Sequence, residues 1–248
     1  MGTPTRFTHG VTTASREENL AMFGMPDPTK WHVFFDDFTE FTTDTSSAAK
    51  YTITTVEAGG SSATEAIGDG AGGLLVITND AADNDSDFFQ KIGESFLFAV
   101  GKRAIFKARF SVSDATAADW IMGLVITDTT PLAAAGDGAT DGVFFQKDAG
   151  DTNIDFYVQK DTTTGQLTST AVATTAAADA FMTIGFSYDG RRTIELFKDD
   201  VMFKAVDLTG TPTAYLPNTE LTVTFGVQNG EAVAKVMTVD YVFAAIER

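Results

Sequence analysis

Two histidines, His9 and His32, are the side chains of this sequence whose ordinary pKa lies close to neutral pH. A serine hydrolase that uses histidine as its base also needs an activated serine, and the sequence has no G-x-S-x-G motif that would place one on a sharp turn. The chain contains no cysteine, so it has no thiolate nucleophile, thiolate metal site or disulfide. We therefore expect His32, beside Trp31 at the start of the first strand, to be a structural imidazole held by a hydrogen bond.

Carboxylates are the other side chains that could take part in catalysis or bind a metal. The chain holds 34 Asp and Glu against 17 Lys and Arg. Glycosidases need two carboxylates that flank the scissile bond, and some carry them on one strand as Glu-x-Asp-x-Glu. No glutamate here opens that spacing; Glu195, for example, begins Glu-Leu-Phe-Lys-Asp. Asp36 and Asp37 would point to opposite faces of a strand. The sequence thus predicts no catalytic residue and no enzymatic activity.

Oxygen-bearing side chains alternate in residues 83–87 (DNDSD), as they do in calcium-binding loops. A hand-type loop requires glycine at its sixth place and a bidentate glutamate at its twelfth. Counted from residue 83, these places hold Phe88 and Glu94, so the match is partial. Two interpretations stay open: a solvated turn before a strand, or an irregular calcium site. The ligands of that site would be Asp83, Asp85 and Asp87, with or without Glu94; our main prediction contains no metal and no other cofactor.

Apolar and polar residues alternate through most of the chain after residue 30. In residues 104–112, for instance, Phe106 and Phe110 share one face while Lys107 and Arg109 share the other, which is typical of a half-buried strand. The strands expected from this pattern span residues 31–38, 51–56, 74–78, 88–92, 95–99, 104–112, 120–127, 143–147, 154–159, 182–188, 194–196, 201–206, 221–227 and 237–243. The dipeptides Asp189-Gly190 and Asn229-Gly230 accept positive φ and predict two tight hairpins.

This many short strands, with turn-rich spacers between them, predicts an all-β fold. We expect a two-sheet antiparallel jelly-roll-like sandwich formed by residues 31–248 as one domain. The 21 phenylalanines fit this fold, since facing sheets about 10 Å apart need large apolar side chains between them. A closed barrel is the alternative, because periodicity does not reveal closure.

Residues 1–30 lack the alternating pattern and are expected to form an N-terminal extended arm with one short helix. Residues 15–18 (SREE) have the form of a capping box before a helix at 16–23, which Gly24 and Pro26 would end. A helix of about eight residues is marginal without docking, so we expect a partner to order the arm. The apolar anchors for that partner would be Leu20, Met22, Phe23, Met25 and Trp31.

The charge and hydropathy of the chain exclude two classes of partner. A net charge of −17 argues against nucleic acid, because phosphate binding needs a cationic stripe. The apolar runs, such as residues 121–126, are far shorter than the ~20 residues of a membrane span. No secretory signal is recognisable, so we expect synthesis in the cytoplasm and no membrane partner.

Several segments resemble structural proteins that are encoded beside the major capsid protein in tailed bacteriophages. They are residues 24–32 (GMPDPTKWH), 34–38 (FFDDF), 141–145 (DGVFF) with the acidic turn at 148–151, and the ending 239–248. Such proteins are concanavalin-like or laminin-G-like sandwiches without an assigned enzymatic role. The resemblance implies a non-enzymatic virion structural protein, made in the host cytoplasm and located on the capsid surface. It would be a capsid decoration or cement protein that binds the major capsid protein as a homo-oligomer.

The alternative function is a carbohydrate-binding module of a head fibre or tail component. Sugar binding would use exposed aromatic faces, for which Trp120 and Tyr215 are the candidates. We expect Trp120 to be buried in the core, because Ile121 and Leu124 follow it. A hydrolase is a third interpretation, and the missing carboxylate spacing argues against it.

Overall fold

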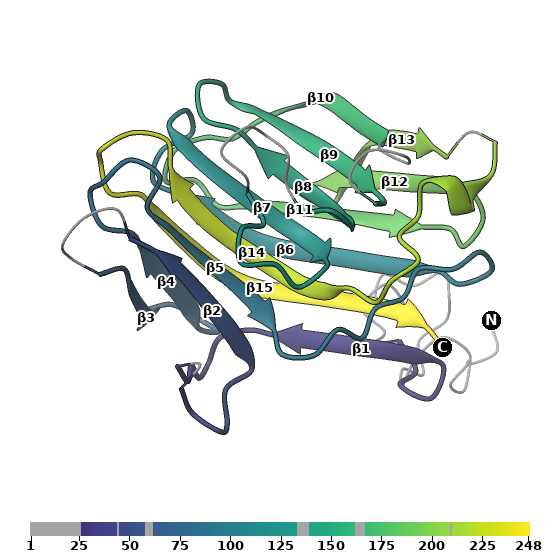
Figure 1. The fold of residues 1–248 in the computed structure, drawn as a ribbon, viewed down its shortest axis with the longest axis horizontal. Coiled ribbons are helices and arrows are strands. Elements are labelled where there is room, and N and C mark those ends of the chain that lie inside the picture. Colours follow the sequence, from purple (N-terminus) through teal and green to yellow (C-terminus); the bar gives the residue numbers. More distant parts are fainter. Residues whose placement is uncertain (1–25, 44, 58–61, 133–138, 162–166, 209) are drawn as a thin grey trace, which may run out of the picture.

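The protein, seen in a computed structural model, consists of two stacked antiparallel β-sheets (Figure 1). The structure describes residues 26–43, 45–57, 62–132, 139–161, 167–208 and 210–248, and for residues 167–175 the backbone only. These residues form fifteen strands and one short 3-10 helix, Pro212–Ala214. The predicted all-β, two-sheet antiparallel sandwich is therefore confirmed, and the barrel alternative is not.

The larger sheet has eight strands and is centred on β6 and β15. Its order is β13 (Val201–Asp207), β12 (Thr193–Lys198), β11 (Met182–Tyr188), β6 (Ala104–Val112), β15 (Val236–Glu247), β4 (Leu74–Thr78) and β3 (Thr64–Gly68). The eighth strand, β1 (Trp31–Asp36), pairs with the second half of β15, so the start of the domain lies beside its end (Figure 1).

The smaller sheet has seven strands and is centred on β7. Its order is β10 (Leu167–Thr175), β9 (Asn153–Gln159), β8 (Gly142–Lys147), β7 (Ala118–Val125), β14 (Thr222–Asn229), β5 (Ser86–Lys91) and β2 (Tyr51–Val56). Phe225 of β14 lies opposite Phe89 on one side and Met122 on the other. Alternate residues of these strands point between the sheets, which gives the core its aromatic content.

Aromatic rings fill the space between the two sheets. Phe89 and Phe225 are stacked with their ring centroids 5.1 Å apart, and Phe106 stacks on Phe186 at 5.6 Å. Trp120 is completely buried and meets the ring of Phe110 edge-on at 5.0 Å. The prediction that Trp120 belongs to the core is confirmed, so its indole is not available as a sugar-stacking face.

One of the two predicted hairpins is correct and the other is wrong. Residues 189–192 connect the paired strands β11 and β12, and the Asp189 carboxylate accepts the backbone N–H groups of Arg191, Arg192 and Thr193. Asn229-Gly230, however, leads from β14 in one sheet to β15 in the other. The Asn229 side chain is fully buried and holds neighbouring loops together, so this dipeptide is a crossover and not a tight turn.

The predicted strands differ from the structure in three places. β3 and β10 lie in the Ala/Thr/Gly-rich segments 57–73 and 161–179, where the alternating pattern predicted no strand. Both are edge strands, and such a segment has too little apolar alternation to be detected. Residues 95–99 form no full strand; Phe96 makes an isolated bridge to Leu221.

The predicted arm falls largely outside the residues that the structure describes. Residues 1–25, which include the expected helix at 16–23 and the anchors Leu20, Met22, Phe23 and Met25, lie outside them. The boundary after residue 30 therefore stays a prediction. Within the described residues, none of the helical segments has the length and hydropathy needed to cross a bilayer.

Candidate functional site

A hollow of about 390 Å³ opens at the end of the sandwich where β1 begins and β15 ends. We call it the end hollow. The residues that line it are His32, Glu94, Ser95, Leu97, Lys102, Glu220, Ile246, Glu247 and Arg248. They combine an imidazole, a hydroxyl, three carboxylates and two cationic side chains with apolar Leu97 and Ile246.

Four segments that are far apart in the sequence meet at the end hollow. His32 on β1 lies directly opposite Ile246 on β15. The loop after β5 is tied to the start of β14 by hydrogen bonds from Ser95 N and Phe96 N to the carbonyl oxygen of Leu221. These bonds bring Ser95 next to the residue that precedes Leu221, which is Glu220. Sheet pairing therefore places the lining residues, although no local motif links them.

His32 and Ser95 form a hydrogen-bonded pair inside the end hollow. The distance between His32 Nε2 and Ser95 Oγ is 2.9 Å, and Lys91 Nζ donates to the same hydroxyl at 3.4 Å. Burial lowers the pKa of His32, and the positive charges of Lys91 and Arg248 lower it further. The imidazole is therefore neutral at pH 7 and can exchange a hydrogen bond with a hydroxyl group in either direction. The expected hydrogen bond to His32 is present, and the ring also faces a hollow.

The imidazole and the hydroxyl do not form a complete catalytic triad. Among the described residues, no carboxylate is hydrogen-bonded to the His32 ring, so no acidic group orients it. On its other side the ring contacts Phe96, with centroids 4.9 Å apart. The pair can bind a polar ligand, and Lys91 is the other described side chain that contacts the Ser95 hydroxyl.

The three carboxylates of the end hollow differ in their hydrogen-bond partners. Glu247 is held by Arg103, whose Nε and Nη2 donate to Oε1 at 2.9 and 2.7 Å. Burial opposes ionisation of Glu247, but the hydrogen bonds from Arg103 outweigh it and lower the pKa of the carboxyl. Glu94 accepts the backbone N–H of Thr127 at 2.7 Å. The Glu220 side chain makes no hydrogen bond or ion pair with a described residue, so its carboxylate is free to take a ligand.

Lys102 is the cationic counterpart of Glu220. Its ammonium group also makes no hydrogen bond or ion pair with another described residue, whereas Arg248 Nε donates to the carbonyl oxygen of Pro28 at 3.3 Å. A free ammonium donates up to three hydrogen bonds and a free carboxylate accepts several. The end hollow therefore offers both a strong donor and a strong acceptor beside the neutral His32–Ser95 pair.

The outward face of the seven-stranded sheet is largely filled by its own side chains. Phe88, Ile121, Phe144 and Tyr157 form a second apolar cluster there, joined by Leu132 from the segment after β7. A Cβ atom at Gly123 would lie 2.5 Å from Phe144, because the phenylalanine crosses the strand at that glycine. Substitution of Gly123 by a residue with a Cβ atom would therefore displace Phe144 and disturb the packing of the cluster.

The same face carries carboxylates on two of its strands. Asp119 of β7 and Asp155 of β9 both alternate with core residues, so both lie on the outward side of the sheet. Burial raises the pKa of Asp119, and its carboxylate accepts the backbone N–H of Ala149. Burial also raises the pKa of Tyr157 in the apolar cluster, and the charges of Asp148 and Asp155 raise it further.

The candidate residues named from the sequence end up in different places. Trp31 begins β1 as a half-buried side chain, and the Arg103 guanidinium covers its ring at 5.4 Å from the centroid. Tyr215 is partly buried against the core. Neither result tests whether Trp31 docks a partner, which stays a prediction.

The four residues of the irregular calcium loop do not come together. Asp85 and Asp87 are buried at the start of β5, and Asp83 is exposed. Glu94 lies beyond the other end of β5, in the end hollow. Glu94 is therefore not a ligand of the same site as Asp83 and Asp85, because the extended strand β5 separates it from them. The set without Glu94 stays an untested alternative.

Sequence reasoning missed most of the end hollow. Ser95, Lys102 and Glu220 sit in loops without periodicity, and no motif connects them. His32 was noticed as one of two histidines, which was the signal available. Only the pairing of β1 with β15 and the bridge from Phe96 to Leu221 reveal that these residues face one another.

Comparison with known proteins identifies the fold. No protein-family model matches the chain, and no curated protein matches it. Among solved structures, a protein of unknown function from Shewanella oneidensis MR-1 aligns with a TM-score of 0.59 at 12% identity, over 94% of this chain and 95% of that one. An endo-1,3-β-glucanase from Streptomyces sioyaensis aligns with a TM-score of 0.56 at 16% identity, over 90% and 99%. Peanut lectin aligns with a TM-score of 0.55 at 10% identity, over 88% and 97%.

These similarities place the chain among the concanavalin-like or lectin-like sandwiches. At these identities they establish the fold and no activity. The prediction that the chain is not an enzyme is nevertheless contradicted, because an endo-1,3-β-glucanase has the same fold. None of the three structures is described as a virion protein. The predicted relationship to phage structural proteins is thus supported in its fold alone.

Proposed function

We propose that this protein binds carbohydrate, and that the end hollow is the saccharide site. The observation that carries the proposal is the free carboxylate of Glu220 and the free ammonium of Lys102 beside the His32–Ser95 pair, in one hollow of about 390 Å³. Pockets for small ligands range from about 300 to 1,000 Å³, so this one has room for a short saccharide.

The chemistry of the lining suits a sugar. Neighbouring hydroxyl groups of a pyranose ring can both donate to one carboxylate, as Glu220 would allow, and a hydroxyl oxygen can accept from Lys102. Leu97 is 43% exposed and offers an apolar contact for the C–H face of the ring. The lectin among the structures with this fold supports the same class of ligand.

A glycan array followed by calorimetry tests the proposal. The full chain should bind a subset of glycans saturably, and Glu220→Gln should weaken that binding at least tenfold, since a bidentate acceptor becomes a mixed donor and acceptor. Glu195→Gln is the matched control, because Glu195 is exposed on β12 and makes no side-chain hydrogen bond or ion pair with a described residue. Absence of any glycan binding by the full chain, or equal affinity of Glu220→Gln, would overturn the proposal.

Turnover should be measured in the same experiment. The glucans of the array, including β-1,3-linked chains, are incubated with the protein and followed for new reducing ends, because an endo-1,3-β-glucanase shares the fold. Release of reducing ends would show that binding leads to hydrolysis. Binding without release would define a lectin-type protein.

Attachment to a phage capsid is a separate proposal, carried by the sequence resemblance alone. In that proposal residues 1–30 attach the sandwich to the major capsid protein, and many copies act together on the capsid surface. The two proposals are compatible, since a saccharide site on a virion surface would contact the host cell envelope.

A further inference from the structure

The sequence contains a single Asn-Gly dipeptide, Asn229-Gly230, and the structure places it where β14 crosses over to β15. Asparagine is a chemically labile residue. It deamidates most readily before glycine, because glycine has no side chain to hinder its backbone nitrogen from attacking the neighbouring side-chain amide. The question is therefore why the fold keeps this reactive pair in the crossover.

Position 230 requires glycine because two chain segments approach it closely. A Cβ atom there would lie 2.2 Å from Ala149 Cβ and 2.8 Å from the carbonyl oxygen of Ala117. The Gly230 N–H donates to the same oxygen at 2.8 Å. Gly230 therefore fits between the segment before β7 and the turn after β8, and a larger residue would push them apart.

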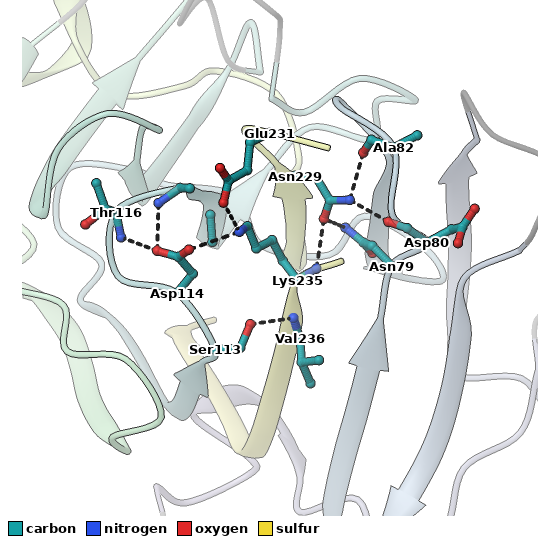
Figure 2. Close-up of polar contacts among 12 residues, drawn as sticks. Asn79, Asp80, Ala82, Ser113, Asp114, Thr116, Asn229, Glu231, Lys235 and Val236 are labelled. Atoms are coloured by element: carbon teal, nitrogen blue, oxygen red, sulfur yellow. Dashed lines mark hydrogen bonds and ion pairs between the residues drawn. The ribbon is translucent and has the colours of Figure 1, made fainter. Parts of the chain in front are cut away.

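Position 229 requires asparagine because its side chain donates and accepts at once (Figure 2). Asn229 Nδ2 donates to the carbonyl oxygens of Asp80 and Ala82 at 2.6 and 2.8 Å. Its Oδ1 accepts from Asn79 Nδ2 at 3.2 Å and from the backbone N–H of Lys235 at 3.1 Å. The side chain has no solvent exposure. Both protons and both lone pairs of the amide are thus in use.

The same contacts oppose the attack of the Gly230 nitrogen on Asn229 Cγ. To approach Cγ, this nitrogen must leave its hydrogen bond to Ala117, and the amide must leave its four partners. The backbone of Asn229 is also held, since its N–H donates to the carbonyl oxygen of Asp85 at 2.8 Å and its own carbonyl oxygen accepts from Asn84 N–H at 2.9 Å. The reaction therefore requires these loops to open first.

We propose that Asn229 is a deamidation site that folding protects and that reacts when the surrounding loops open. In the opened chain a hydroxide ion removes the amide proton of Gly230, and the nitrogen forms a bond to Asn229 Cγ. The bond from Cγ to Nδ2 then breaks, and the side-chain nitrogen takes a proton from water and leaves as ammonia. Water adds to either carbonyl carbon of the resulting succinimide, which gives aspartate or isoaspartate at position 229.

Deamidation makes the opening of the loops irreversible. A carboxylate at position 229 has no proton to donate, so its oxygen would face the carbonyl oxygens of Asp80 and Ala82 directly. Contact between acceptors in a buried site raises the free energy of the folded state. Isoaspartate also adds a methylene group to the main chain at the end of β14. A chain that has opened and reacted therefore does not regain the native loops.

Peptide mass spectrometry of the full chain tests the protection. In one mildly alkaline buffer, Asn229 should deamidate at least tenfold more slowly in the folded protein than in a denaturing concentration of urea. A synthetic peptide of residues 225–234, kept in the same two solutions, measures the effect of urea on the reaction itself. Asn218 is the internal control, because it is exposed in the folded protein. Asn79→Ala, which removes one partner of Asn229 Oδ1, should speed the reaction in the folded protein.

Refolding from urea tests the irreversibility. Asn229→Asp should recover a much smaller native fraction than the wild type, whereas Asn218→Asp, the matched control, should refold as the wild type does. Equal rates of deamidation at Asn229 with and without urea, after correction with the peptide, would overturn the protection. Refolding of Asn229→Asp to wild-type stability would overturn the irreversibility. Should Asn79→Ala fail to fold, the comparison of the two solutions keeps the test decisive.

Discussion

Lys235 offers a sharp test of how polar groups hold the loops at the end of the sandwich where β14 ends and β15 begins (Figure 2). Its side chain is 2% exposed, and Nζ donates to Asp114 Oδ2 at 3.0 Å and to Glu231 Oε1 at 2.6 Å. Its backbone N–H donates to Asn229 Oδ1, the residue that fixes the β4–β5 loop. The perturbation is Lys235→Met, which keeps an unbranched side chain of nearly the same length and removes the charge.

The expected cost follows from the exposure of the two carboxylates. Removing one partner of a fully buried ion pair costs about 3 to 5 kcal/mol, because the other charge stays buried. Here the side chains of Asp114 and Glu231 are 32% and 49% exposed, so water can solvate them when the cation is gone. We therefore expect the free energy of unfolding to fall by about 2 kcal/mol, below the fully buried range.

The pKa of Asp114 provides an internal check on that figure. Hydrogen bonds from the backbone N–H groups of Ala117 and Thr116, followed by the one from Lys235, lower it to about 2. One unit corresponds to about 1.4 kcal/mol, and solvent screening reduces the sum, so Lys235 contributes only part of the total through Asp114. A depressed carboxyl pKa gives stability that is present above the unfolded value of 3.8 and lost as pH falls toward 2.

Urea unfolding of the wild type and Lys235→Met between pH 7 and pH 2.5 measures the effect. The difference in unfolding free energy should be constant from pH 7 to about 4 and should shrink below that, as Asp114 becomes protonated. Lys204→Met on β13 is the control, because Lys204 forms no ion pair with a described residue. A difference below about 0.5 kcal/mol at pH 7, or one that grows toward low pH, would refute the reasoning.

Two further predictions concern the end hollow and the arm. NMR titration of His32 should give a midpoint below 6.5, because burial and the charges of Lys91 and Arg248 lower its pKa; the stability that depends on its neutral form should be complete above 6.5 and decline as pH falls below that value. Lys91→Met should move the midpoint up, and a wild-type midpoint at or above 6.5 would contradict this account. Deleting residues 1–30 should reduce occupancy on undecorated capsid shells at least tenfold in co-sedimentation, while undiminished occupancy would remove the proposed role of the arm.

Most of the fold prediction came from the alternation of apolar and polar residues along the chain. In strands such as residues 104–112 and 182–188, large apolar residues recur at every second position because one face packs in the core. That information is local, so it survives in the sequence. The edge strands β3 and β10 were missed because an edge in an Ala/Thr/Gly-rich segment has no strict alternation to detect.

The turn-forming dipeptides predicted the strand connections less well than expected. Asp-Gly at 189–190 forms the predicted hairpin, whereas Asn-Gly at 229–230 crosses between sheets. The dipeptide specifies that the backbone can turn, and the partner of each flanking strand is chosen by packing. The same limit applies to the irregular calcium loop, where spacing along the chain suggested Glu94 and the fold placed it at the opposite end.

The sequence by itself determined the class of fold, the aromatic core and the absence of thiol chemistry, because each depends on residue type and short-range alternation. Tertiary structure alone decided which residues share a site. His32, Ser95 and Glu220 meet because β1 pairs with β15 and a loop bridges to β14, and Asn229 meets Asp80 because the crossover after β14 lies beside the β4–β5 loop. Contacts between segments so distant in sequence depend on the order of the strands in the sheets. The alternation within one strand does not indicate which strands lie beside it.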